Sequence, residues 1–389
     1  MTSGKVKTGI DILERDGFNC FKNERVGLIV NPSSANSSLE STLSVFIKNK
    51  VKITALFGPE HGLRGEAQDQ EECIGFMDEK CGAPIYSLYG RHLSPHRGML
   101  KNVTTLVFDI QCIGSRFYTF KWTLFLVLQR AAQFEKKIII LDRPNPINGI
   151  EIEGPMLEHD YESFVGLFPI PIRHAMTIGE LALLFSEEFS IGVDPDIVKM
   201  EGWQRELWFD KTGLPWIAPS PNMPTIDTAT VYPGMCLIEG TNISEGRGTT
   251  KPFEYFGAPW FDCELILEEL RELPGCKLRQ ICFKPQWGKY EGKVCAGFQL
   301  HITDRDVYKP VKSAIEIIRA IYKTHPEDFA WRQPPYEFEE EKLPFDILVG
   351  NHVIREIIEK GSSTDTIEKA CNKGIEEFTG TKRKYELYK

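Results

Sequence analysis

The segment from residue 58 to 65, GPEHGLRG, places three side chains that could do chemistry within five positions: Glu60, His61 and Arg64. Its glycines permit the positive φ angles of a tight turn. A carboxyl group can donate a proton, and an imidazole changes charge near neutral pH. We therefore take Glu60 as a candidate proton donor with His61 beside it. The alternative is that Glu60 and Arg64 only pair with each other to hold the loop.

Two further segments carry polar side chains at a density typical of binding loops. Residues 111–120 offer Gln111, Arg116 and Tyr118. Residues 239–260 offer Glu239, Asn242, Glu245, Arg247 and Trp260. Carboxylates can do acid–base work, amides and guanidinium groups bind hydroxyls and acids, and an aromatic ring covers the apolar face of a sugar. The mixture suits sugar recognition, although any one of these residues could instead only hold its loop.

The elements that must position these residues begin with four short apolar runs. The runs are apolar on both faces and alternate with helical patterns, which indicates an α/β fold with a parallel sheet buried on both sides. They cover residues 26–31, 52–57, 105–110 and 137–142. Capping boxes at Ser37 with Glu40 and at Thr177 with Glu180 predict two helix starts. A third helix is expected over residues 122–128, with Trp122 in the core.

Each predicted strand runs directly into polar residues at its carboxyl end. In open α/β sheets ligands bind beyond that edge, because loops and helix amino termini meet there. The strand ends predict a ligand cleft and add candidate binding residues, namely Asn31, Gln111, Arg143 and Asn145. They also add Asp109, which joins Glu239 and Glu245 as a candidate for a second catalytic group beside Glu60.

The second half of the chain has a different texture. Five prolines between residues 215 and 233 predict a passage that is neither helix nor central strand, and we place a domain junction near Tyr232. Alternation over residues 294–302 predicts a strand, and helical spacing over 311–322 predicts a helix. The expected domains are therefore 1–232 and a smaller α+β domain, 233–389. The acidic run at 337–341 is expected to be a solvated loop.

Composition excludes several classes of function. The 46 basic and 55 acidic side chains give a net charge of −9, which argues against a nucleic-acid partner. Apolar runs are too short to cross a membrane, and the amino terminus lacks the apolar core of a secretory signal. The chain as written is therefore expected in the cytoplasm, or exported if its amino terminus is truncated. The sequence does not indicate an oligomeric state.

Familiar cofactor and metal motifs are missing from the sequence. The ten cysteines are scattered without a CxxC pair, which fits buried free thiols better than a metal site. GxGxxG, the P-loop pattern, HExxH and GxSxG are also absent. We therefore expect neither a cofactor nor a metal, and an oxidoreductase lacks its glycine fingerprint.

At its motifs the chain resembles the NamZ family, exo-acting β-N-acetylmuramidases of peptidoglycan turnover. The resemblance runs through VGLIVNPSS, LFGPEHGLRG, PIYSLYG, DIQCIGSRFYTF, LDRPNPING, SFVGLFPIPIRHAMTIGELA, WIAPSPNMPT and EGTNISEGRGTTKPFEYFGAPW. It implies a Rossmann-like amino-terminal domain, a smaller carboxyl-terminal domain and an active cleft between them. It also implies release of N-acetylmuramic acid from the non-reducing ends of peptidoglycan fragments or muropeptides, with Glu60 as the leading acid and Asn222 of SPNMP among the binding residues.

A site for an acidic sugar is expected to contain a cationic side chain, since a guanidinium group can bind a carboxylate through two parallel hydrogen bonds. Candidates to grip the lactyl carboxylate of muramic acid are Arg64, Arg116, Arg143 and Arg247. The chain departs from the family pattern at Cys112, where DIQD is usual, and at Ala175, where RHG is usual. Cys112 favours the alternative hypothesis, a non-catalytic muropeptide sensor or carrier that uses the same cleft. The stereochemistry of hydrolysis is left open.

Overall fold

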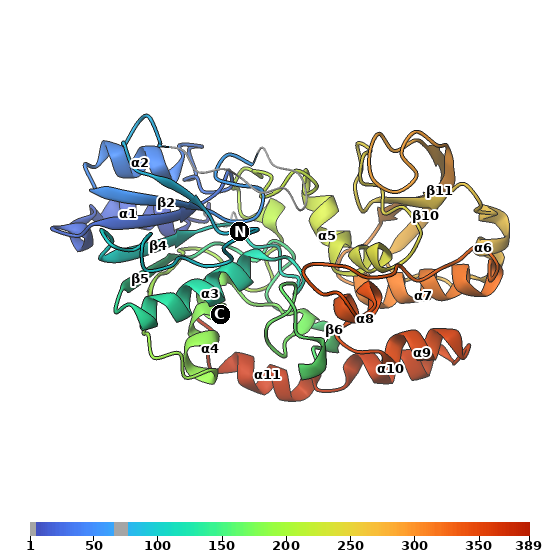
Figure 1. Cartoon of the computed structure of the whole chain (residues 1–389). Coiled ribbons are helices and arrows are strands. Elements are labelled where there is room, and N and C mark those ends of the chain that lie inside the picture. Colours follow the sequence, from blue (N-terminus) through green and yellow to red (C-terminus); the bar gives the residue numbers. More distant parts are fainter. Residues whose placement is uncertain (1–4, 66–76) are drawn as a thin grey trace.

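The computed structural model describes residues 5–65 and 77–389. Its larger part is built on a six-stranded sheet in the order β3-β2-β1-β4-β5-β8, with every neighbouring pair parallel (Figure 1). This order has the Rossmann pattern, and it confirms the predicted α/β fold and all four predicted strands. The strands are β1 Val26–Val30, β2 Ile53–Gly58, β3 Ile85–Ser87, β4 Thr105–Asp109, β5 Lys137–Leu141 and β8 Asp196–Val198.

Helices cover both faces of this sheet (Figure 1). They include α1 Gly9–Asp16, α2 Thr42–Lys48, α3 Phe120–Gln133 and α4 Ile178–Glu188. Trp122 is fully buried, as expected of a helix that lies flat on the sheet. The capping box at Thr177 is confirmed at the start of α4. The predicted helix start at Ser37 is wrong.

The helix predicted from Ser37 begins later because its first residues are held in a turn. The side-chain oxygen of Asn36 accepts hydrogen bonds from the backbone of Ser38 and Glu40, at 3.0 and 2.9 Å. That turn competes with helix formation, which is the usual effect of an Asn at such a position. Helix α2 therefore starts at Thr42, where the hydroxyl of Ser41 caps it by accepting from the backbone of Ser44.

The smaller part of the chain holds an antiparallel sheet in the order β10-β11-β9 and a set of helices, so the α+β expectation is met. The predicted strand is β11 and the predicted helix is α7. These elements are α5 Ile226–Met235, β9 Tyr255–Ala258, α6 Cys263–Glu269, β10 Cys276–Phe283, β11 Cys295–Ile302, α7 Pro310–Thr324, α8 Pro344–Val349 and α9 Val353–Glu359.

The proline-rich passage departs from its prediction where it enters α5. Pro233 lies inside this helix, close to its carboxyl end, and the chain continues as a 3₁₀ turn over Cys236–Gly240. A proline there removes only a hydrogen bond of the last turn, which a short helix tolerates. The predicted junction at Tyr232 falls within α5, and the division into 1–232 and 233–389 stays a prediction.

The last helices lead the chain back to the larger sheet (Figure 1). After α10 Thr364–Asn372 and α11 Ile375–Arg383, the hydroxyl of Tyr388 donates to the carboxylate of Asp142 at the end of β5. It also accepts from the backbone of Met200, at 3.0 Å. The backbone of Leu387 donates to Glu180 in α4, at 2.9 Å. Residues 387 and 388 thus complete the packing of a sheet whose strands end nearly 200 positions earlier.

No helix within the described residues is both long and apolar enough to cross a membrane. The nine cysteines in the described ranges are all free thiols, of which five are buried.

A small hairpin, β6 Glu153–Met156 with β7 Pro171–Arg173, buries a carboxylate at a cost in stability. One oxygen of Glu153 accepts from the backbone of Lys312 at 2.9 Å, whereas the other makes no hydrogen bond within the part of the chain that the structure describes. Burial raises the pKa of Glu153 to about 7. The folded protein therefore holds a proton that the unfolded chain, with a pKa of about 4.3, releases. The free energy of unfolding that protonated Glu153 contributes at low pH is therefore lost as the pH rises from about 4.3 to about 7.

We expect Glu153→Gln to raise the free energy of unfolding at pH 8 by roughly 1–3 kcal/mol, because the amide keeps the hydrogen bond and removes the charge. At pH 5 the gain should shrink to about a third. Urea unfolding at both pH values measures it. The control Glu151→Gln, on a surface pair with Lys309, should change stability by less than about 0.5 kcal/mol. A shift of equal size at both pH values would contradict the assignment to Glu153 ionisation.

Candidate active site

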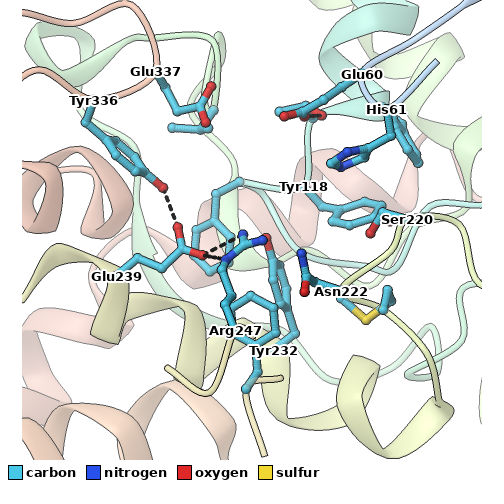
Figure 2. A pocket seen from close by; sticks show the side chains of 16 residues that line it. Glu60, His61, Tyr118, Ser220, Asn222, Tyr232, Glu239, Arg247, Tyr336 and Glu337 are labelled. Carbon is cyan, nitrogen blue, oxygen red and sulfur yellow. Dashed lines mark hydrogen bonds and ion pairs between the residues drawn. The ribbon is translucent and has the colours of Figure 1, made fainter. Parts of the chain in front are cut away.

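A pocket lies where the loops after β2 and β4 meet α5 and the smaller part of the chain (Figure 2). It encloses about 490 Å³ of empty space, counting the part that is open to solvent. Its described lining consists of Glu60, His61, Phe117, Tyr118, Thr119, Phe120, Val165, Ser220, Asn222, Met223, Tyr232, Glu239, Arg247, Phe253, Tyr336 and Glu337.

One wall carries the turn predicted from GPEHG. Gly58 ends β2, and a side chain there would meet the backbone nitrogen of Leu63 at 2.5 Å, so the turn requires glycine. His61 has a φ of 68° and lines the pocket beside Glu60. The hydroxyl of Thr119, at the amino end of α3, donates to Oε2 of Glu60 at 2.6 Å. This bond orients the carboxyl group of Glu60, a residue that is 5% exposed.

The opposite wall holds a second carboxylate, Glu239 (Figure 2). Nε and Nη2 of Arg247 donate to its Oε1 at 2.9 and 2.7 Å, and the hydroxyl of Tyr336 donates to its Oε2 at 2.9 Å. Burial by itself would raise the pKa of Glu239, but the Arg247 charge and these hydrogen bonds lower that pKa below its ordinary value. Glu239 is therefore negatively charged at neutral pH.

Two further charged side chains, Glu245 and Lys289, lie near Arg247 outside the pocket lining. Oε1 of Glu245 lies 3.7 Å from Nε of Arg247, and Oε2 of Glu245 lies 3.0 Å from Nζ of Lys289. Nζ of Lys289 also donates to the carbonyl of Ile243, at 2.9 Å. Glu245 is buried and lies outside the lining of the pocket, so its charged contacts are with Arg247 and Lys289.

Six of the residues proposed from the sequence meet in this pocket, namely Glu60, His61, Tyr118, Asn222, Glu239 and Arg247. Two strand-end candidates pair with each other elsewhere. Nε of Arg143 donates to Oδ1 of Asp109 at 2.5 Å and Nη2 donates to Oδ2 at 2.9 Å. Thr42 donates to the same Asp109 carboxylate. The predicted roles of Asp109 in catalysis and Arg143 in binding lack support from this geometry, because each serves as the other's partner.

The amide candidates at the strand ends hold backbone rather than line the pocket. Each donates its side-chain nitrogen to a carbonyl: Asn31 to Pro219 at 3.0 Å, Gln111 to Pro144 at 2.7 Å, and Asn145 to Met176 at 3.1 Å.

The remaining candidates also lie outside the lining. Arg116 is fully buried, and its guanidinium donates to four backbone carbonyls, those of Pro155, Ile170, Leu348 and Val349. The amide of Asn242 bonds to the backbone of Asp328 and Ala330, at 2.8 and 3.0 Å. Trp260 donates to the hydroxyl of Tyr290 at 3.0 Å. Arg64 is exposed and does not line the pocket.

The pocket also contains residues that the sequence interpretation missed. Glu337 begins the acidic run that was expected to be a solvated loop, yet it is 9% exposed and lines the pocket beside Tyr336. Figure 2 shows its carboxylate on the side that faces Glu60. The expectation was wrong at Glu337 but holds at Glu340 and Glu341, which are exposed. Glu337 turns inward because the backbones of Tyr336 and Glu339, on either side of the turn, exchange two hydrogen bonds. Aromatic residues alternating with acidic ones were the signal available in the sequence. Ser220, Tyr232 and Phe253 were missed as well.

The two departures from the family pattern both lie outside the pocket lining. Cys112 is buried outside the lining, and burial raises the pKa of its thiol to about 11, so the thiol is neutral at pH 7. Ala175 is buried with a φ of 55°, a conformation that glycine adopts without strain. Neither residue contributes a charged group to the pocket.

In residues 5–65 and 77–389, no group of three or more His, Cys, Asp and Glu side chains is placed to hold a metal ion.

Comparison with known proteins covers nearly the whole chain. Residues 26–227 match the family described as exo-β-N-acetylmuramidase NamZ, N-terminal, and residues 230–388 match its C-terminal counterpart. The peptidoglycan β-N-acetylmuramidase NamZ of Bacillus subtilis (strain 168) is 48% identical over 387 residues, which are 99% of this chain and 92% of that protein.

Two solved structures of DUF1343 family proteins from Bacteroides fragilis NCTC 9343 share the fold. One has a TM-score of 0.88 at 33% identity and the other 0.79 at 30% identity, each covering 99% of both chains. The resemblance noted from the motifs is confirmed over both parts of the molecule: the chain belongs to the NamZ family of exo-β-N-acetylmuramidases.

Proposed function

We propose that this protein is an exo-acting β-N-acetylmuramidase, which hydrolyses the bond between a terminal N-acetylmuramic acid and the rest of a peptidoglycan fragment. The observation that carries the proposal is the pair of carboxyl groups on opposite walls of one pocket, Glu60 and Glu239. Glycosidases of most families place a sugar between two such groups. The Bacillus subtilis relative carries the same activity in its name.

In the proposed reaction Glu60 donates a proton to the oxygen of the leaving group. The bond from the anomeric carbon to that oxygen breaks, and its electron pair stays with the oxygen. Glu239, charged at neutral pH, stabilises the positive charge that develops on the anomeric carbon. Water then adds to that carbon and releases a proton, which returns Glu60 to its acid form. His61 lies next to Glu60 on the same wall and binds substrate in this scheme.

Of the four arginines considered for the lactyl carboxylate, Arg247 is the one that lines the pocket within the described residues. Its guanidinium stacks at 5.1 Å on the ring of Phe253 and is held by Glu239. We assign to it the attraction for the acidic sugar. Asn222 and Tyr118 supply the amide and the hydroxyl that can bind sugar hydroxyls.

The test is chromophore release from 4-nitrophenyl β-N-acetylmuramide and from the corresponding N-acetylglucosaminide. Hydrolysis of the muramide at the higher kcat/KM is expected, since only muramic acid carries the lactyl carboxylate. Faster turnover of the glucosaminide would overturn the specificity. Tight binding of the muramide in calorimetry without turnover would favour the alternative, a muropeptide-binding sensor or carrier.

A further inference from the structure

The acidic loop that lines the pocket continues into an exposed aromatic side chain, Phe338. This ring is 59% exposed, and it directly follows Glu337, which lines the pocket. Single exposed apolar residues are common and need no explanation by themselves. Phe338 differs from such residues because a tight turn and two neighbouring rings hold it in one position.

The loop holds two consecutive residues in the left-handed region, with φ values of 48° at Glu337 and 67° at Phe338. Residues other than glycine pay for this conformation, which persists only where the surroundings impose it. Here Tyr336 and Glu339 impose it by exchanging two backbone hydrogen bonds, at 2.8 and 2.9 Å. The turn directs Glu337 into the pocket and leaves Phe338 at its rim.

Two buried rings of the larger domain hold Phe338 in place. Its ring centroid lies 5.8 Å from that of Tyr89 and 6.0 Å from that of Phe164, with interplanar angles of 59° and 80°. Tyr89 and Phe164 are each 4% exposed and contact one another at 5.8 Å. We call these three residues the rim cluster. Phe164 precedes Val165, which lines the pocket. The rim cluster is therefore continuous with the pocket on both sides of the domain interface.

An exo-acting enzyme buries the non-reducing terminal sugar, so the rest of the substrate must pass outward through the mouth of the pocket. A sugar ring has an apolar face of C–H groups that packs on an aromatic ring. The rim cluster offers such a ring, already fixed by aromatic contacts, so that little conformational entropy is lost on binding.

We propose that Phe338 is the platform of a second sugar subsite, which binds the sugar that leaves with the aglycone. The inference rests on the proposed function, since it takes the terminal sugar to lie between Glu60 and Glu239. It also gives a role to the PIYSLYG segment, whose Tyr89 supports the platform and does not line the pocket.

The test compares two substrates, the disaccharide of N-acetylmuramic acid β-linked to N-acetylglucosamine and the methyl β-N-acetylmuramide, which has no second ring. Phe338→Ala should raise KM for the disaccharide about tenfold, in line with the loss of one aromatic contact, and leave the methyl glycoside within about twofold. Phe338→Trp should restore the disaccharide KM. Val294→Ala, at a side chain that is 63% exposed and outside the pocket lining, is the matched control.

Each other result has a distinct meaning. An equal loss on both substrates would overturn the subsite, because Phe338 would then act by holding Tyr336 and Glu337. No change on the disaccharide would overturn it as well. If the wild-type protein hydrolyses neither substrate, the proposed activity fails by itself. Calorimetry with the disaccharide then decides the subsite, according to whether Phe338→Ala weakens binding about tenfold or not at all.

Discussion

Glu60→Gln should lower kcat for the disaccharide and the methyl glycoside by about 10²- to 10⁴-fold, the usual contribution of a positioned general acid. The amide keeps the shape of the side chain and can still accept from Thr119, so KM and the unfolding midpoint should change little. The loss should be much smaller for the 4-nitrophenyl glycoside, because nitrophenolate leaves without needing a full proton. Steady-state kinetics on the three substrates measures this pattern.

The dependence on the leaving group separates proton donation from other roles of Glu60. A residue that only shaped the turn would reduce all three rates by the same factor. The control Glu340→Gln, at an exposed carboxylate of the acidic loop, should leave every rate unchanged. If Glu60→Gln kept more than about a tenth of the wild-type rate on the disaccharide, its assignment as the acid would be wrong.

Glu239→Gln should lower kcat on all three substrates by about 10²- to 10³-fold, because it removes negative charge from the place where positive charge develops. This factor should not depend on the leaving group, in contrast to that of Glu60. The substitution also removes the charged partner that holds the half-buried guanidinium of Arg247 at 2.7 Å, so a loss of stability on the order of 2 kcal/mol is expected. Rates measured at saturating substrate, together with urea unfolding, separate the two effects.

Arg247→Met tests the role of Glu239 by removing the cation that pairs with its carboxylate. Arg247 lowers the pKa of Glu239, so its removal should raise that pKa and move the acid limb of the pH profile of kcat to higher pH. Rates lost at pH 5 should recover in part at pH 8, where Glu239 is again charged. An acid limb that stays where the wild type has it would show that Glu239 does not govern it.

The fold could be predicted from the sequence because the patterns that indicate strands and helices lie within short segments of the chain. Hydrophobic runs and the Thr177 capping box depend on neighbouring residues, and both were confirmed. The turn at Glu60 was found for the same reason, since glycine spacing is visible in the chain.

The partners of the strand-end side chains could not be predicted from the sequence. Asp109 and Arg143 were chosen because both were expected at the carboxyl ends of strands, and the structure places them there, at the ends of β4 and β5. They nevertheless satisfy one another in a buried ion pair, and a sequence does not contain the distance that pairs them. Arg116 was chosen for its charge, yet its side chain is used by four backbone carbonyls that converge only after folding.

The second wall of the pocket could not be predicted because its residues are far apart in the chain. Glu239 was recognised within a polar loop, but its contact with Tyr336 spans 97 positions. The acidic run around Glu337 has the composition of a solvated loop, but buried Tyr336 and the turn that it closes with Glu339 bring that carboxylate inside.

The contact of Tyr388 with Asp142 bears on how the protein is made. The two residues are 246 positions apart, which a ribosome covers in roughly 10–50 s at ordinary rates of synthesis. During that interval Asp142 and Glu180 have emerged with their sheet, while Tyr388 and Leu387 have not been synthesised. The polar contacts of Asp142 and Glu180 are therefore complete only after residues 387 and 388 have been synthesised. A fragment that stops before residue 387 would lack the contacts of Leu387 with Glu180 and of Tyr388 with Asp142.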